Sequence, residues 1–171
     1  WRTMSFSSHP LNMSDSCLLP EFDPAECADI AHRLFALEGS LKLLYGERDL
    51  NYLITTDSGK FVFKIANADE ARGMLDCQHR VFERLEQNQV FPLIACARKS
   101  VNDREIETVQ DAQGREHFCR VLPYLEGRMW SEFKISSPEL LQDLGANLAT
   151  LDLALQGFSH PGIERPLLWN M

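Results

Sequence analysis

The sequence predicts an α+β fold in which an antiparallel sheet carries one long helix and a second helical part follows. Three observations support this class. Short strand-like runs are joined by short polar turns, as in antiparallel sheets. One long segment with helical periodicity interrupts those runs. A leucine-rich helical segment lies beyond a linker, and the chain after it is too short to provide a second core.

Composition limits the classes of partner. The chain has 171 residues, 44% of them apolar, and a net charge of −8, which is typical of a globular protein. Its basic residues are scattered, so we expect no nucleic-acid partner. No apolar run approaches the roughly 20 residues of a membrane helix. The five cysteines form no C-x-x-C pair and no signal peptide is visible, so we expect a cytoplasmic protein with reduced thiols.

The chain is expected to begin with a tail and a helix. Residues 1–22 are rich in Ser, Pro and Asn and have no periodicity, which predicts a flexible tail. Asp23 is a good helix cap, and Pro24 suits the first turn. Apolar residues continue at helical spacing to about Leu37, and Gly39 provides a stop.

Three strands are expected next, at residues 41–45, 50–56 and 60–66. The last two should form a hairpin, because the turn between them is polar and ends in Gly59. A second hairpin is expected at 104–110 and 116–124, turning at 111–114. Another extended stretch begins at Pro92.

Two further helices are predicted. The first spans about 68–88, with an apolar stripe that includes Leu75, Phe82 and Leu85. The second spans about 138–156, is capped by Ser136 or Ser137 and carries a stripe of leucines.

Lys64 is the first candidate functional residue along the chain. Alternation along its strand places Phe61, Phe63 and Ile65 on one face and Lys64 on the other. A lysine between apolar neighbours needs an anionic partner if it is buried. A solvated lysine on an exposed face is the alternative.

Two other features complete a pattern. The hairpin at residues 46–51 carries a glycine and could lay backbone N–H groups along phosphates, although an ordinary turn is the alternative. Acidic residues of the long helix could reach Lys64, although a charged solvent-facing surface is the alternative. A glycine-bearing hairpin, a strand lysine and then a helical acid form the small-lobe layout of protein-kinase-like phosphotransferases.

Several stretches make the pattern specific. The chain resembles the aminoglycoside phosphotransferase and choline kinase family, and within it the hydroxylysine kinase group and its bacterial relatives. The resemblance covers residues 38–171 in order. The matching stretches are 46–52, 60–65, 75–78, 120–128, 144–149, 158–161 and 168–170.

The resemblance implies a protein-kinase-like small lobe at 23–124, then a hinge and the start of a helical large lobe at 125–171. It implies ATP as the nucleotide, with Mg²⁺ in the complete protein, and a small amino alcohol or hydroxy amino acid as substrate. Lys64 matches the phosphate-binding lysine, and Asp76 matches its helical partner, with Glu70 as the alternative. The other residues implied in nucleotide binding are Gly46, Glu47, Arg48, Asp49 and Asn51 in the loop, and Pro123, Tyr124 and Leu125 in the hinge.

One departure from the family matters for function. The sequence has no His-x-Asp pair with a following Asn and no later metal-binding Asp. Phosphoryl transfer needs a group that orients the nucleophile and carboxylates that hold Mg²⁺. We therefore expect no catalytic residue and no metal ligand here, and an N-terminal portion that is inactive without its large lobe or a downstream domain.

Bacterial relatives also occur joined to a class III aminotransferase that uses pyridoxal phosphate. The alternative function is therefore a non-catalytic nucleotide-binding or regulatory domain of such a fusion. Pyridoxal phosphate is expected only if an aminotransferase domain follows.

Overall fold

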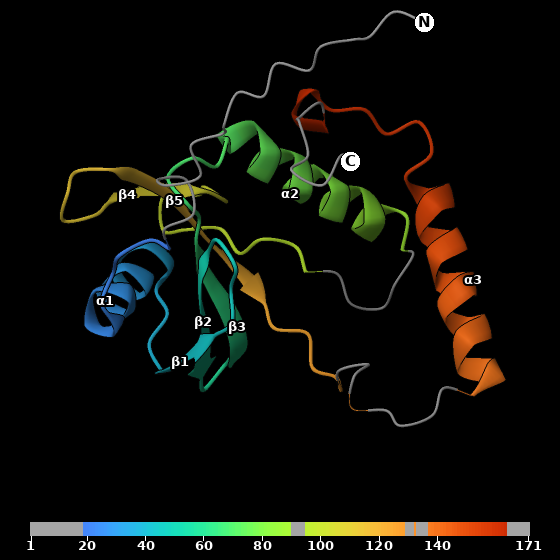
Figure 1. Ribbon diagram of the computed structural model, residues 1–171, viewed down its shortest axis with the longest axis horizontal. Coiled ribbons are helices and arrows are strands. Elements are labelled where there is room, and N and C mark those ends of the chain that lie inside the picture. Colours follow the sequence, from blue (N-terminus) through green and yellow to red (C-terminus); the bar gives the residue numbers. More distant parts are fainter. Residues whose placement is uncertain (1–18, 90–94, 129–131, 133–136, 164–171) are drawn as a thin grey trace, which may run out of the picture.

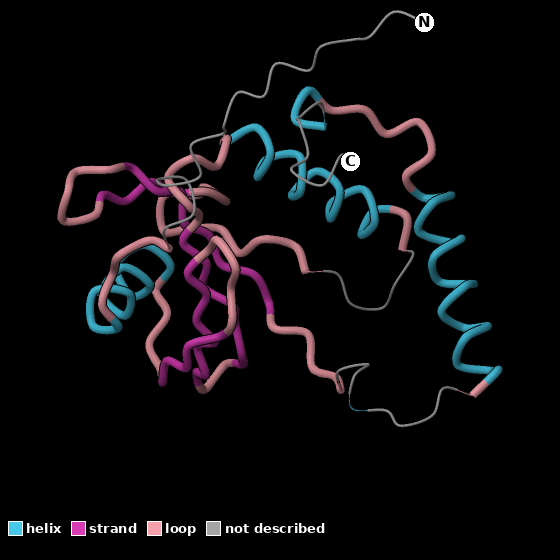
Figure 2. The backbone as a smooth tube through the Cα atoms, in the orientation of Figure 1, coloured by secondary structure: helices cyan, strands magenta, loops and turns pink. Residues whose placement is uncertain are grey.

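The computed structural model describes residues 19–89, 95–128, 132 and 137–163. Within them, five antiparallel strands form one sheet in the order β1-β2-β3-β5-β4. Helices α1 and α2 lie on opposite sides of this sheet, and α3 lies beyond α2 (Figures 1 and 2). The predicted α+β class is confirmed. Most of the predicted tail and the expected extended stretch at Pro92 lie outside the described residues.

Helix α1, Pro24–Phe35, begins as predicted. The Asp23 side chain accepts from the Glu26 N–H while Glu26 accepts from the Asp23 N–H, a reciprocal cap. The helix ends earlier than expected, because Ala36 adopts the left-handed conformation at φ 50° and stops it before Gly39. Phe22, the last residue of the predicted tail, packs against the core.

The strands are β1 Ser40–Leu44, β2 Leu50–Thr56, β3 Gly59–Ile65, β4 Glu107–Gln110 and β5 Glu116–Pro123. The two predicted hairpins, β2–β3 and β4–β5, both form. Strand β5 then pairs with β3, so that Lys64 lies opposite Arg120. This pairing joins segments that are far apart in the sequence.

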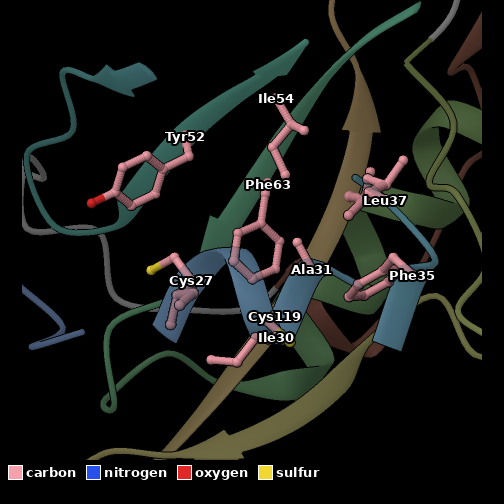
Figure 3. Close-up of a cluster of buried hydrophobic side chains, with 11 residues drawn as sticks. Cys27, Ile30, Ala31, Phe35, Leu37, Tyr52, Ile54, Phe63 and Cys119 are labelled. Atoms are coloured by element: carbon pink, nitrogen blue, oxygen red, sulfur yellow. The ribbon is translucent and has the colours of Figure 1, made fainter. Parts of the chain in front are cut away.

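The main core lies between α1 and one face of the sheet (Figure 3). The apolar side of β3 points into it, and both Phe63 and Ile65 have no exposed surface. Phe63 meets Phe35 of α1 edge to face, with ring centroids 6.2 Å apart. The predicted alternation along β3 is confirmed, and the opposite face of the strand is left for Lys64.

Helix α2, Arg72–Gln87, covers that opposite face. It starts later than predicted because a turn precedes it, in which the Asp69 N–H donates to the Asn67 side chain and the Glu70 N–H to the Asn67 carbonyl. A small apolar cluster of Ala66, Leu75 and Ile106, with Phe118 packed against it, lies on this side. The remaining space between α2 and the sheet holds polar side chains.

Helix α3, Pro138–Ala154, is capped by Ser137, one of the two predicted caps, whose side chain accepts from the Leu140 N–H. None of its described residues is buried, and Leu153 is 71% exposed. After it, the short 3₁₀ turn η2, Pro161–Ile163, returns to α2. No helix in the described part of the chain is long and apolar enough to span a membrane.

From the hydrogen bonds in the β4–β5 turn, we expect the stability of the fold to depend on pH. The Asp111 carboxylate accepts from the backbone N–H groups of Gln113 and Arg115, from Arg115 Nε at 2.6 Å and from His117 Nε2 at 3.2 Å. Burial alone would raise the pKa of Asp111, but these bonds outweigh it and hold the pKa well below the ordinary value of 3.8. The ionised Asp111 carboxylate therefore stabilises the fold fully at pH values above the ordinary pKa of 3.8.

We expect this stabilisation to be lost as the pH falls from about 4 towards the lowered folded-state pKa. Asp111→Asn should be less stable at neutral pH and should lose less stability on acidification. Urea unfolding of both proteins between pH 7 and pH 3 measures this. Parallel stability curves would contradict the role of Asp111.

Candidate functional site

Lys64 lies in the middle of the sheet with polar neighbours on both sides. Its Nζ donates to Asn51 Oδ1 of β2 at 2.7 Å and lies 3.5 Å from Asp49 Oδ2. The side chain is only 22% exposed, so it is not the solvated lysine of the alternative interpretation. The anionic partner that a buried lysine requires comes from the loop before β2.

The electrostatic surroundings leave the Lys64 ammonium under-compensated. Burial lowers the pKa of Lys64 most, the carboxylate of Asp49 raises it, and the nearby Arg120 lowers it further. The net direction is downwards, because one partly exposed carboxylate does not offset burial and a second cation. An anionic ligand at this position would relieve that imbalance.

The β1–β2 loop and Lys64 line one open pocket of about 270 Å³, called here the lysine pocket. Asn51 Nδ2 donates to the Asp49 carbonyl at 3.2 Å, so the loop folds back onto its own strand. The structure thus brings together the loop residues proposed from the sequence. The lining residues are Gly46, Glu47, Arg48, Asp49, Asn51, Lys64 and Glu70.

Position 46 requires glycine, because other atoms of the loop lie too close to leave room for a side chain. A Cβ atom there would lie 2.2 Å from the Asp49 carbonyl oxygen and 2.3 Å from Asn51 Nδ2. We expect Gly46→Ala to destabilise the protein by about 1–3 kcal/mol through backbone displacement and to disturb the Asn51–Lys64 bond. Unfolding by urea and amide chemical shifts measure both effects.

Gly127→Ala is the matched control, because a Cβ at Gly127 meets nothing within 4 Å. Equal stability of the two variants, with unchanged amide shifts at residues 46–51, would show that the loop tolerates a side chain at position 46.

Asp76 does not meet Lys64, so the expected ion pair between them was wrong for this structure. Asp76 Oδ2 lies 3.0 Å from His160 Nε2, and Asp76 Oδ1 lies 3.6 Å from Arg80 Nε. Leu75 and His79 are buried towards the sheet, and Asp76 is about 100° further round the helix than Leu75. Its carboxylate therefore faces the segment around η2.

Glu70, the alternative partner, lines the lysine pocket together with Lys64. It lies in the turn before α2 and not on the helix. It also lines a neighbouring pocket of about 440 Å³ between Arg48, the start of α2 and Pro161. Of the two acids proposed from the sequence, the structure places Glu70 at the site.

Arg120 is a site residue that the sequence interpretation missed. It is 5% exposed, and it donates through Nη2 to Gln78 Oε1 at 2.7 Å and through Nη1 to His79 Nε2 at 3.3 Å. The available signal was an arginine between the apolar residues Cys119 and Val121 on a strand, the same pattern that singled out Lys64. Its proximity to Lys64 needed the β3–β5 pairing.

The expected hinge, residues 123–125, begins at the last residue of β5. Pro123 ends that strand and has no N–H, and the Tyr124 N–H donates to the Lys60 carbonyl at 3.0 Å. Leu125 is 49% exposed. Pro123 has no N–H to donate, and the Tyr124 N–H is used by β3. Of the three expected hinge residues, Leu125 therefore has the N–H that is neither missing nor donated to Lys60.

The described residues contain no group of three or more His, Cys, Asp or Glu side chains arranged to hold a metal ion. The lysine pocket is lined by two cations, Arg48 and Lys64, and by three carboxylates, Glu47, Asp49 and Glu70, and its Lys64 ammonium can form charge-assisted hydrogen bonds to an anionic group.

Comparison with known proteins identifies the group to which these features correspond. The model of the phosphotransferase enzyme family (APH) matches residues 42–170. Hydroxylysine kinases are similar over most of the chain: that of Mus musculus is 25% identical over 92% of this chain and 46% of its own length. That of Bos taurus is 25% identical over 96% and 48%, respectively. The chain thus spans about half the length of these relatives.

Solved structures of kinases share the fold. The amicoumacin kinase hAmiN, in complex with AMP-PNP, Ca²⁺ and Ami, has a TM-score of 0.71 at 17% identity, covering 87% of this chain and 45% of that one. A microcompartment-associated aminopropanol kinase has a TM-score of 0.65 at 15% identity, covering 86% and 45%. The protein-kinase-like fold expected from the resemblance is confirmed.

Proposed function

This chain belongs to the phosphotransferase enzyme family, and on that premise we propose that it binds ATP at Lys64 as the small lobe of a small-molecule kinase. The observation that carries the proposal is the buried ammonium of Lys64, which faces an open pocket formed with the 46–49 loop. A largely buried ammonium that faces an open pocket can form charge-assisted hydrogen bonds to a phosphate group.

Different residues of this chain would bind the phosphates and the adenine of the nucleotide. Lys64 would hold phosphate oxygens through charge-assisted hydrogen bonds, with Asn51 fixing its ammonium in place. The loop at 46–49 would cover the phosphates. The hinge would hold adenine through the Leu125 N–H and its carbonyl groups, since the Tyr124 N–H already bonds to β3.

The acceptor substrate is proposed to be a small amino alcohol or hydroxy amino acid. Support comes from the hydroxylysine kinases and the aminopropanol kinase that the chain resembles. The chain lacks a His-x-Asp segment, and its described residues lack a metal cluster. We propose that chain beyond this portion supplies the group that orients the acceptor hydroxyl and the ligands for Mg²⁺.

The missing His-x-Asp segment also favours a second candidate, a non-catalytic nucleotide-binding domain of a larger protein. A class III aminotransferase that uses pyridoxal phosphate is the fusion partner proposed for it. The two candidates differ in one observable. A longer natural chain that contains this sequence consumes ATP in the presence of an amino alcohol only in the first case.

Nucleotide binding itself can be tested on this chain. Titration of ¹⁵N-labelled protein with AMP-PNP and Mg²⁺ should shift the amide signals of residues 46–51, 63–65 and 124–125 in a saturable way. Shifts confined to other regions, or no shifts at millimolar nucleotide, would refute the proposed site. Sodium chloride at equal ionic strength is the control for non-specific charge effects.

A further inference from the structure

A second buried cation stands beside the proposed phosphate-binding lysine. Lys64 on β3 and Arg120 on β5 are directly opposed in the antiparallel register, so their side chains share the face that α2 covers. Asn51 continues the row on β2, opposite Lys64. The lysine and the arginine are both largely buried, and two like charges side by side in a sheet are unfavourable unless something offsets them.

The groups that hold Arg120 are neutral. Its two bonds go to the amide oxygen of Gln78 and to the imidazole Nε2 of His79, both on α2. Burial, together with the charges of Arg120 and Arg80, lowers the pKa of His79 to about 4, so the ring is neutral near pH 7. In the part of the chain that the structure describes, Arg120 has no carboxylate within ion-pair distance.

On the other side of the His79 ring, Nδ1 is buried near a carboxylate and makes no hydrogen bond to a described residue. Because Nε2 accepts from Arg120, the ring hydrogen lies on Nδ1, which is 3.4 Å from Glu105 Oε2. Arg80 Nη2 donates to the same carboxylate oxygen at 2.6 Å. Helix α2 is thus tied by Arg80 to the loop before β4.

From the sequence, Lys64 of the sheet is expected to pair with a carboxylate of the long helix. The contacts between the sheet and α2 are of a different kind. Asp76 faces away, and the described polar connection from the sheet to the middle of α2 runs through Arg120. Burial lowers the pKa of Arg120, and the carboxylates of Asp49 and Glu70 raise it by less. The pair Lys64–Arg120 therefore places two largely buried cations side by side, with Asp49 3.5 Å from Lys64 and neutral groups bonded to Arg120.

We propose that Arg120 is a positioning residue that ties α2 to the sheet and supplies the second positive charge of the phosphate site, so that the site selects polyphosphates over monophosphates. The inference rests on the proposed function. Arg120 is too buried to be a direct ligand in this structure, and it acts through its field on the lysine pocket and through Gln78 and His79 on the helix.

The first experiment needs no nucleotide. The ¹³Cε signal of Lys64 in lysine-labelled protein reports its pKa in the wild type, in Arg120→Met, which removes the charge, and in Arg120→Lys, which keeps it. Removing the charge should raise the pKa of Lys64, whereas the lysine variant should stay close to the wild type. An unchanged pKa of Lys64 in a folded Arg120→Met protein would overturn the electrostatic role.

The second experiment compares ligands of different charge. Calorimetric titration with ATP, ADP and AMP should show that Arg120→Met loses about 10-fold in ATP affinity and little in AMP affinity, with Arg120→Lys recovering most of the loss. If the wild type binds none of the three, the proposed function fails. If it binds ATP and the methionine variant keeps the wild-type ratio of ATP affinity to AMP affinity, only the role of Arg120 fails.

Gln78→Leu keeps the inference testable if Arg120→Met does not fold. It removes the acceptor of Arg120 Nη2 and leaves the guanidinium in place. Amides of α2 should exchange faster with deuterium, and ATP affinity should fall about 3-fold. Unchanged exchange in α2 together with unchanged affinity would overturn the positioning role.

Discussion

Lys64→Ala is expected to weaken MgATP binding by about 10- to 100-fold, as judged by calorimetry, with little change in the stability of the fold. The range corresponds to roughly 1.5–3 kcal/mol for a hydrogen bond to a charged group. Stability should be kept because Lys64 faces a pocket and is not part of the apolar core. The substitution also removes the cost of burying the ammonium.

Lys60 provides the matched control on the same strand. It lies four residues earlier on the same face, it is 42% exposed, and its Nζ donates to Glu126 at 2.6 Å. Lys60→Ala removes the same charge from the protein and should leave nucleotide affinity within about 2-fold, because exposed ion pairs contribute little. Equal losses in the two alanine variants would show that net charge and not a site at Lys64 governs binding.

The parts of the site that are local in sequence could be predicted. Alternation along β3 assigned Phe63 to the core and Lys64 to the other face because the side-chain period of a strand is two. The loop at 46–51 followed from a glycine between two strand-like runs. Both inferences use residues that are neighbours along the chain, and the structure places Lys64 and the loop residues around one pocket.

The parts of the site that depend on non-local packing could not be predicted from the sequence. The spacing of twelve residues between Lys64 and Asp76 does not determine which side of α2 faces the sheet, and a rotation of about 100° separates Asp76 from Leu75. Arg120 could be placed beside Lys64 only once β5 was paired with β3 and not merely with β4. The resemblance indicated an acid at the helix, whereas the helix here presents Gln78 and His79 to the sheet.

Helix ends show the same limit on a smaller scale. Gly39 was the expected stop for α1 because glycine adopts left-handed conformations easily. The chain uses Ala36 at φ 50° instead. Leu37, just after it, is buried in the core, so burial of this side chain accompanies a turn that local propensity disfavours.

Phe63→Ala is the prediction with the largest expected effect on stability. Its side chain has no exposed surface and packs in the cluster between α1 and the sheet (Figure 3). Deleting a buried phenyl ring typically costs about 3–5 kcal/mol, through lost transfer free energy and the cavity left behind. The free energy of unfolding in urea should fall by that amount, a large fraction of the total for a domain of this size.

Phe61→Ala is the control that separates burial from residue type. Phe61 points to the same side of β3 but is only half-buried at the edge of the cluster, with the Arg98 guanidinium 5.3 Å from its ring centroid. The same deletion there should cost about half as much, because less apolar surface leaves water. Equal costs at both positions would contradict the core described here. Together with Lys64→Ala, the pair tests whether one strand serves the core through one face and the nucleotide site through the other.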